Sequence, residues 1–270
     1  MQDDRKPKPI TDYGATMTLR PTKNWLRTAP LTGSQFVVER GQDPSALVVA
    51  FTGFAGKLSV PTFDFLRSTE LLNYNRILLC DNSRTCYMNG IPPVAEDVGV
   101  LIALLRRHID QLAPKHTMFI GSSGGSHAAV LFGHLLGADY VHAFSPHTNI
   151  DPAYWRASEV PEDVEAYSET IVKMEHVPSA ARAYFDLREV LRESNGKTAY
   201  NLHVCAQSPR DLARALRLDG LPGVMIHRHP CAHHRVGVWL ASQRRLLPLL
   251  KLENQPGFAA AVVGGEPTAV

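Results

Sequence analysis

A serine lies at the centre of a glycine-rich stretch, Gly121–Gly125 (GSSGG), which reads Gly-x-Ser-x-Gly around Ser123. An apolar run, residues 117–120, comes directly before it, and a pattern typical of a helix begins at Ser126. A serine on a sharp strand-to-helix turn projects its hydroxyl group away from the backbone, and only small residues fit two positions to either side. The N-terminus of the following helix favours developing negative charge. The stretch therefore predicts a nucleophile at Ser123.

Two alternatives remain open for this stretch. Ser126 is a second candidate nucleophile, because Gly124 lies two residues before it and Ala128 two residues after it, but it would lie one turn into the helix. A turn rich in glycine and serine can also bind a phosphate group or simply connect a strand to a helix. The flanking strand and helix favour Ser123.

A serine nucleophile needs a base, and a histidine-rich stretch, His227–His234, follows the last apolar run. His234 immediately precedes an amphipathic helical pattern, so its loop can fold back over the serine, and we favour it as the base. His233 is the alternative base. His227 and His229 would share one face of a strand and could bind a metal. No acidic or cysteine cluster accompanies them, so we expect no metal and no cofactor.

A base histidine needs a carboxylate that orients it. Asp211 is the one carboxylate near the end of the apolar run at residues 202–206, and we favour it as the acid. Ser208, Pro209 and Asp211 also resemble the start of a helix, with Ser208 as N-cap, so a capping role competes with the catalytic one. Asp151, in the loop after another apolar run, is the alternative acid.

Acyl transfer also needs two N–H donors that face the oxyanion of the tetrahedral intermediate. One donor comes from the residue after the nucleophile, here Gly124. The second comes from the loop after an earlier strand, and Phe51–Gly56 (FTGFAG) follows the first strong apolar run. Gly53 would permit a turn that leaves the Phe54 N–H pointing inward. We therefore predict Phe54 and Gly124 as the oxyanion hole, with an ordinary glycine-bearing turn as the alternative.

Apolar runs alternate with helical patterns along the chain, and several runs are apolar on both faces. This alternation predicts an α/β fold with a mostly parallel, doubly wound sheet. Two further runs, near 16–19 and 35–38, could supply leading strands. The predicted strands of the sheet are 47–51, 76–80, 117–120, 140–144, 202–206 and 224–227.

The helical patterns fall between these runs. One opens at Pro92, and its apolar stripe consists of Val94, Val98, Leu101 and Leu105. Residues 147–198 contain no convincing strand but carry helical patterns such as 180–191, so we expect a helical cap or lid inserted into the fold. Residues 1–252 then form one domain, and 253–270, which lack periodicity, form a flexible C-terminal tail.

The composition narrows the class of protein. The chain has 270 residues, of which 44% are apolar and 20% charged, as in an ordinary globular domain. Its net charge of +2 and lack of a basic run argue against nucleic acid as a partner. No apolar run reaches the ~20 residues of a membrane span, and no signal peptide is evident. Cys80 and Cys205 lie in apolar runs and are expected to be buried thiols, typical of a cytoplasmic protein.

Over roughly residues 45–250, the chain resembles the α/β-hydrolase superfamily. The likeness rests on the Gly-x-Ser-x-Gly turn and on the chain order Ser123, Asp211, His234. It implies a parallel sheet, a sharp turn that carries the serine, and a cap. It also implies a serine hydrolase of the esterase or thioesterase type. The chain departs from the common pattern in lacking an HGGG stretch and in having Thr52 rather than histidine before Gly53.

The leading functional hypothesis is hydrolysis of an ester or thioester through an acyl-enzyme intermediate. The expected substrate is a small molecule or an acyl group linked to a carrier. The same site could instead carry acyl transfer, cyclisation or another non-hydrolytic biosynthetic reaction. A third hypothesis is a degenerate fold used only for binding. Fold alone does not fix the substrate, and the sequence predicts neither the substrate nor the oligomeric state.

Overall fold

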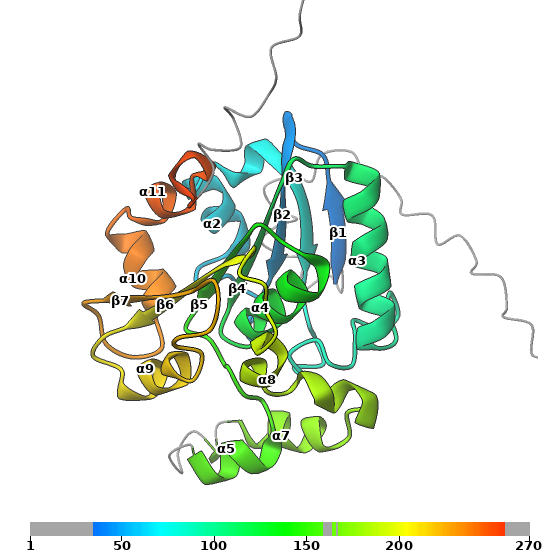
Figure 1. Cartoon of the computed structure of the whole chain (residues 1–270), viewed down its shortest axis with the longest axis vertical. Coiled ribbons are helices and arrows are strands. Elements are labelled where there is room, and N and C mark those ends of the chain that lie inside the picture. The colour runs from blue at the N-terminus through cyan, green and yellow to red at the C-terminus, as the bar shows by residue number, and fades with distance from the viewer. Residues whose placement is uncertain (1–34, 159–163, 166, 257–270) are drawn as a thin grey trace, which may run out of the picture.

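The computed structural model describes residues 35–158, 164–165 and 167–256 of the chain. A seven-stranded sheet runs through it in the order β1-β3-β2-β4-β5-β6-β7, with helices on both sides (Figure 1). β1 pairs antiparallel with β3, and the other neighbouring strands pair in parallel. The fold is therefore α/β, with the mostly parallel, doubly wound sheet that the sequence predicts. The strands are β1 Phe36–Glu39, β2 Asp43–Phe51, β3 Tyr74–Leu79, β4 His116–Ser122, β5 Tyr140–Phe144, β6 Ala199–Cys205 and β7 Val224–His229.

The central strands are buried on both faces because helices cover both sides of the sheet. In β2, every residue from Ala46 to Phe51 is buried. Alternate side chains of this strand enter different cores: Leu47, Val49 and Phe51 join one, and Ala46, Val48 and Ala50 join the other. Such a strand reads as a continuous apolar run, which is why these strands could be predicted.

Helices α3, α4 and α8 pack into the first core, and α2, α10 and α11 pack into the second. α4 is almost entirely buried, and it contacts β2, β4 and β5. It is therefore the helix that ties the turn after β4 to the centre of the sheet. The helices are α2 Thr62–Ser68, α3 Val98–Leu112, α4 Gly124–Leu136, α5 Pro152–Ser158, α7 Ser168–Glu175, α8 Leu187–Leu191, α9 Pro209–Leu216, α10 Val236–Ser242 and α11 Leu246–Leu250.

Two helical patterns differ from the sequence prediction. α3 begins at Val98 rather than at Pro92, because the side chain of Asp97 accepts a hydrogen bond from the Val100 N–H and caps the helix there. Val94, predicted in the apolar stripe, lies before the helix and is 43% exposed. After β7 the helical pattern breaks into α10 and α11, since Arg244 between them has a φ of +56°.

Residues 147–198 separate β5 from β6, and the described part of this segment holds helices and no strand. The predicted helix at 180–191 consists of two pieces, the 3₁₀ helix η2 (Ser179–Tyr184) and α8. They separate at Asp186, whose side chain caps α8 by accepting from the Arg188 N–H. α5 and α7 contact each other and lie together at one end of the molecule, apart from the sheet (Figure 1).

The C-terminal tail begins later than predicted. Glu253 lies within a short 3₁₀ helix, Leu252–Asn254, and the Gln255 side chain is buried. Gln255 Nε2 donates to the carbonyls of Leu249 and Lys251, so the folded body extends past residue 252. Residues 257–270, and the strand predicted near 16–19, lie outside the described residues. None of the helices in the described ranges is long and apolar enough to cross a membrane.

The prediction of a free thiol at Cys205 is wrong. Cys205 ends β6 and forms a disulfide with Cys231, with the two Cα atoms 4.8 Å apart. The pairing arises because β6 and β7 are parallel neighbours: Cys205 lies opposite His229, two residues before Cys231. Cys80 and Cys86 are free and buried.

Candidate active site

Ser123 occupies a strained turn between β4 and α4. Its φ of +54° and ψ of −122° lie in a region that residues other than glycine rarely adopt. The turn is tight enough that a Cβ atom on Gly121 would lie 2.0 Å from the Gly125 carbonyl oxygen, and one on Gly125 would lie 2.2 Å from that of Phe51. The two outer glycines of the motif are therefore required by close backbone packing.

The structure brings Ser123, His234 and Asp211 together: Ser123 lies in the turn after β4, His234 in the loop after β7, and Asp211 in the first turn of α9, after β6. His234 Nε2 lies 2.9 Å from Ser123 Oγ, and His234 Nδ1 lies 2.8 Å from Asp211 Oδ1. A carboxylate oxygen only accepts, so Nδ1 of His234 carries the proton. Nε2 then presents a lone pair to the serine hydroxyl, which is the arrangement that a general base requires.

Asp211 serves the helix and His234 through different atoms. Its backbone N–H donates to Ser208 Oγ at 3.4 Å, so Ser208 is the N-cap of α9 as the sequence suggests. The reciprocal capping bond is absent, because the Ser208 N–H donates to the Cys205 carbonyl instead. The fully buried Asp211 carboxylate is thus available to His234, with guanidinium nitrogens of Arg214 and Arg210 at 3.7 and 3.9 Å from Oδ1.

The alternative candidates have other contacts. Asp151 caps α5: its Oδ1 accepts from the backbone N–H groups of Ala153 and Tyr154. His233 is exposed and has a φ of +63°. Ser126 is fully buried, and its Oγ lies 2.8 Å from the Phe144 carbonyl oxygen, which ties α4 to β5.

The two residues predicted to form the oxyanion hole lie side by side. Gly124 is the first residue of α4, where backbone N–H groups have no partner within the helix. A Cβ atom on Gly124 would lie 2.5 Å from the Phe54 ring, so this ring covers the glycine. The loop after β2 also closes against the turn, since a Cβ atom on Gly53 would lie 2.6 Å from the Ser122 carbonyl oxygen.

Sequence reasoning missed His147, which the structure places beside Ser123. Its side chain is fully buried, and Nε2 lies 3.4 Å from Ser123 Oγ. Burial holds the pKa of His147 well below its ordinary value, and the charges of Arg214 and His234 act in the same direction. A signal was available, because His147 follows β5 closely and the carboxyl ends of parallel strands meet at one edge of a sheet.

Aromatic rings surround His147. The rings of Trp155, Tyr167 and Phe54 have centroids 5.1, 5.8 and 6.1 Å from its own. Trp155 comes from α5, and Tyr167 immediately precedes α7, so the inserted segment packs directly onto the site. Trp155 is itself buried and donates from Nε1 to the Asn149 carbonyl.

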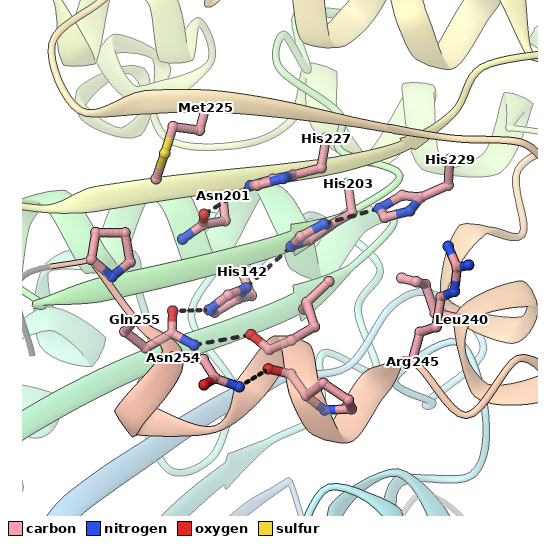
Figure 2. Close-up of a pocket in the computed structure, with 13 residues that line it drawn as sticks. His142, Asn201, His203, Met225, His227, His229, Leu240, Arg245, Asn254 and Gln255 are labelled. Carbon is pink, nitrogen blue, oxygen red and sulfur yellow. Dashed lines mark hydrogen bonds between the residues drawn. The ribbon is translucent and has the colours of Figure 1, made fainter.

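His227 and His229 lie elsewhere, in a cavity of about 420 Å³ between β5–β7 and the α10–α11 segment (Figure 2). Gln255 Oε1, His142, His203 and His229 form a continuous hydrogen-bonded row in this cavity. Both amide hydrogens of Gln255 face carbonyl oxygens, so its Oε1 accepts from His142 Nε2–H, and each neutral imidazole in turn donates from Nε2 to Nδ1 of the one before. Across the described ranges, no three His, Cys, Asp or Glu side chains converge as metal ligands.

Comparison by sequence finds no matching family model and no matching curated protein. Comparison by structure finds similar solved structures. An α/β hydrolase enzyme from a sediment metagenome of the Mar Chica lagoon, Morocco, is 13% identical with a TM-score of 0.50, over 80% of this chain and 91% of that one. MenH from Staphylococcus aureus is 12% identical with a TM-score of 0.53, over 84% and 98%.

A third similar structure is the capsule O-acetyltransferase of Neisseria meningitidis serogroup A. It is 14% identical with a TM-score of 0.54, over 78% of this chain and 90% of that one. At these identities the likeness extends to the arrangement of the backbone and no further. Because the neighbours share the parallel sheet over most of their own length, this chain has the α/β-hydrolase fold.

Proposed function

We propose that the protein is a serine hydrolase that cleaves an ester or thioester through an acyl-enzyme intermediate. The observation that carries the proposal is the continuous row of hydrogen bonds from Asp211 through His234 to Ser123, with distances of 2.8 and 2.9 Å. The strained backbone at Ser123 supports it, because strain of this kind clusters at active sites.

In the proposed reaction, Ser123 Oγ attacks the acyl carbon while its proton passes to His234 Nε2. Asp211 keeps the proton of His234 on Nδ1 and stabilises the imidazolium that forms. The protonated His234 then gives its proton to the leaving alcohol or thiol. Water then attacks the acyl carbon as it loses a proton to His234. The Oγ–carbon bond breaks, His234 returns the proton to Ser123 Oγ, and the acid leaves.

The backbone N–H groups of Phe54 and Gly124 are the proposed donors to the oxyanion. The contact of the Phe54 ring with Gly124, the residue after Ser123, supports this proposal. Gly124 begins α4, so the helix dipole adds to the stabilisation of negative charge there.

A panel of acyl esters and thioesters tests the proposal, with Ser123→Ala and Ser126→Ala compared. Ser123→Ala should lower kcat by several powers of ten, to about the level that binding alone supports. Ser126→Ala is the matched control, because it removes a neighbouring hydroxyl that bonds to the backbone. Equal activity in wild type and Ser123→Ala would contradict the assignment.

Acyl transfer is the second candidate function. The aromatic side chains packed around His147, beside Ser123, favour it. Trp155, Tyr167 and Phe54 surround His147, and we expect apolar rings this close to the site to restrict access of water to an acyl-enzyme. An acyl-enzyme shielded in this way can react with a bound alcohol or amine instead. Adding acceptor alcohols to the ester assay decides between the two: transfer gives a new ester, and hydrolysis gives only the free acid.

A further inference from the structure

His147 is held rigidly beside the nucleophile. The Nδ1 atom of His127, inside α4, lies 3.0 Å from the His147 carbonyl oxygen and fixes the backbone there. Two residues earlier, the Ser145 N–H donates to the His203 carbonyl. The aromatic rings around the His147 imidazole then fix the side chain, so the 3.4 Å approach of Nε2 to Ser123 Oγ is built into the fold.

The positions of the hydrogens around Ser123 Oγ determine whether His147 donates or accepts a hydrogen bond there. The hydroxyl has one hydrogen, and His234 Nε2 presents a lone pair to it, because Asp211 holds the His234 proton on Nδ1. The serine hydrogen therefore points to His234. Only lone pairs of Oγ face His147, so an attractive contact with His147 Nε2 requires an N–H at that nitrogen.

The surroundings of His147 Nδ1 favour the same tautomer, with the hydrogen on Nε2. Nδ1 is buried and has no hydrogen-bond partner among the residues that the structure describes. A neutral imidazole has one N–H. With the hydrogen on Nδ1, a buried donor would be unpaired and two lone pairs would face each other at Ser123 Oγ. With the hydrogen on Nε2, only one acceptor is unpaired, which costs less.

We propose that His147 is a further catalytic residue, which donates a hydrogen bond from Nε2–H to Ser123 Oγ. The inference rests on the proposed function and adds a second imidazole to its site. As Oγ loses its proton to His234 and bonds to the acyl carbon, the N–H of His147 stabilises the charge that builds on Oγ. The carbonyl π electrons move to the carbonyl oxygen in this step.

The same hydrogen bond acts when the acyl-enzyme breaks down. The electron pair of the Oγ–carbon bond returns to Oγ, which recovers a proton from His234, and His147 keeps its own proton throughout. The 3.4 Å separation is long for such a bond. Catalytic hydrogen bonds are often long in a free enzyme and shorten as charge develops.

A purely structural role for His147 makes the opposite prediction for one substitution. His147→Phe keeps an aromatic ring among Trp155, Tyr167 and Phe54 and removes the unpaired Nδ1, but it has no donor. If His147 only packs, this variant should be fully active and at least as stable as the wild type. If His147 donates to Oγ, the variant should fold and react slowly.

The experiment measures the rate at which a fluorophosphonate probe modifies Ser123, together with the melting temperature, in the wild type, His147→Phe and His147→Gln. The phenylalanine variant should react about 10²-fold more slowly, as expected for loss of one donor, without melting earlier. The glutamine variant retains an N–H donor and should therefore react about tenfold faster than the phenylalanine variant. In ester hydrolysis, kcat should fall and KM should change little.

Two results would overturn the inference and leave the proposed function intact. One is modification of His147→Phe at the wild-type rate, and the other is a glutamine variant that reacts as slowly as the phenylalanine variant. No modification of wild-type Ser123 would overturn both. If His147→Phe melts early, His147→Leu, which also lacks a donor, gives the same comparison: a slow leucine variant supports the donor role, and a fast one excludes it.

Discussion

Asp211 takes part both in the start of helix α9 and in the hydrogen bond to His234, two roles that the sequence alone presents as alternatives. The backbone N–H completes the start of α9 by bonding to Ser208, while the carboxylate, buried beside Arg214, bonds to His234. The guanidinium groups nearby offset the cost of burying a carboxylate. The cap holds the backbone of Asp211, and that position determines where the carboxylate meets the imidazole.

Asp211→Asn should lower kcat by about 10⁴, because an amide no longer enforces the tautomer of His234 that has its lone pair at Nε2. Ser208→Ala is the matched control. It removes the N-cap side chain and should lower the unfolding free energy by about 1 kcal/mol with turnover largely kept. Steady-state kinetics and urea denaturation measure both. Normal turnover in Asp211→Asn with early unfolding would reduce Asp211 to a structural residue.

At the level of strands and loops, Asp211 and His234 lie in the segments that follow β6 and β7. Cys205 lies six residues before Asp211, and Cys231 lies three residues before His234, so the Cys205–Cys231 disulfide joins the two loops near their starts. The disulfide closes a loop of 26 residues. It therefore restricts the unfolded chain and also limits how far the two loops can separate in the folded state.

Cys231→Ser should lower the unfolding free energy by about 3 kcal/mol, the value expected for a loop of this length. Adding dithiothreitol to the wild type should have the same effect, whereas Cys80→Ser should leave the effect of reductant unchanged. Urea midpoints with and without reductant measure this. Titration of all four cysteines as free thiols in the unreduced, unfolded protein would show that the bond does not form.

The sequence predicts the strands well because a strand buried on both faces is a continuous apolar run, as in β2 and β5. Helix boundaries depend on single side chains, and the cap at Asp97 moves the start of α3 away from the Pro92 that predicts it. Contacts between distant segments leave the weakest signal. His147 could be inferred only from its place just after β5, at the edge where the carboxyl ends of the strands meet. The Cys205–Cys231 pair depends on which strands become neighbours, and no local pattern reports that.

Across the entire fold, buried histidines make stability depend on pH. Burial lowers the pKa of His127 and of His142 from 6.5 to about 4 in each case. His203, in the row of imidazoles of Figure 2, also has its pKa lowered by burial. The unfolded chain takes up protons at these histidines as the pH falls below about 6.5. The folded chain takes them up only at lower pH, near 4 for His127 and His142. The free energy of unfolding is therefore full above about pH 6.5 and falls as the pH decreases toward about 4.

His127 and His142 should each contribute a loss of at most about 3 kcal/mol across this window. His142→Asn should reduce the difference in unfolding free energy between about pH 7 and about pH 5. His176→Gln, at an exposed histidine, should leave that difference unchanged. Urea denaturation at the two pH values measures it. An unfolding free energy independent of pH in the wild type would contradict the burial of neutral imidazoles.

Whether Ser123 is the nucleophile can be read from the residue that a covalent probe modifies. The protein is incubated with a fluorophosphonate probe, digested and analysed by mass spectrometry. We expect one adduct, on Ser123, which is absent in Ser123→Ala and strongly reduced in His234→Ala, since the proposed base is then missing. An adduct on Ser126, or an unmodified wild-type protein under conditions that label other serine hydrolases, would contradict it.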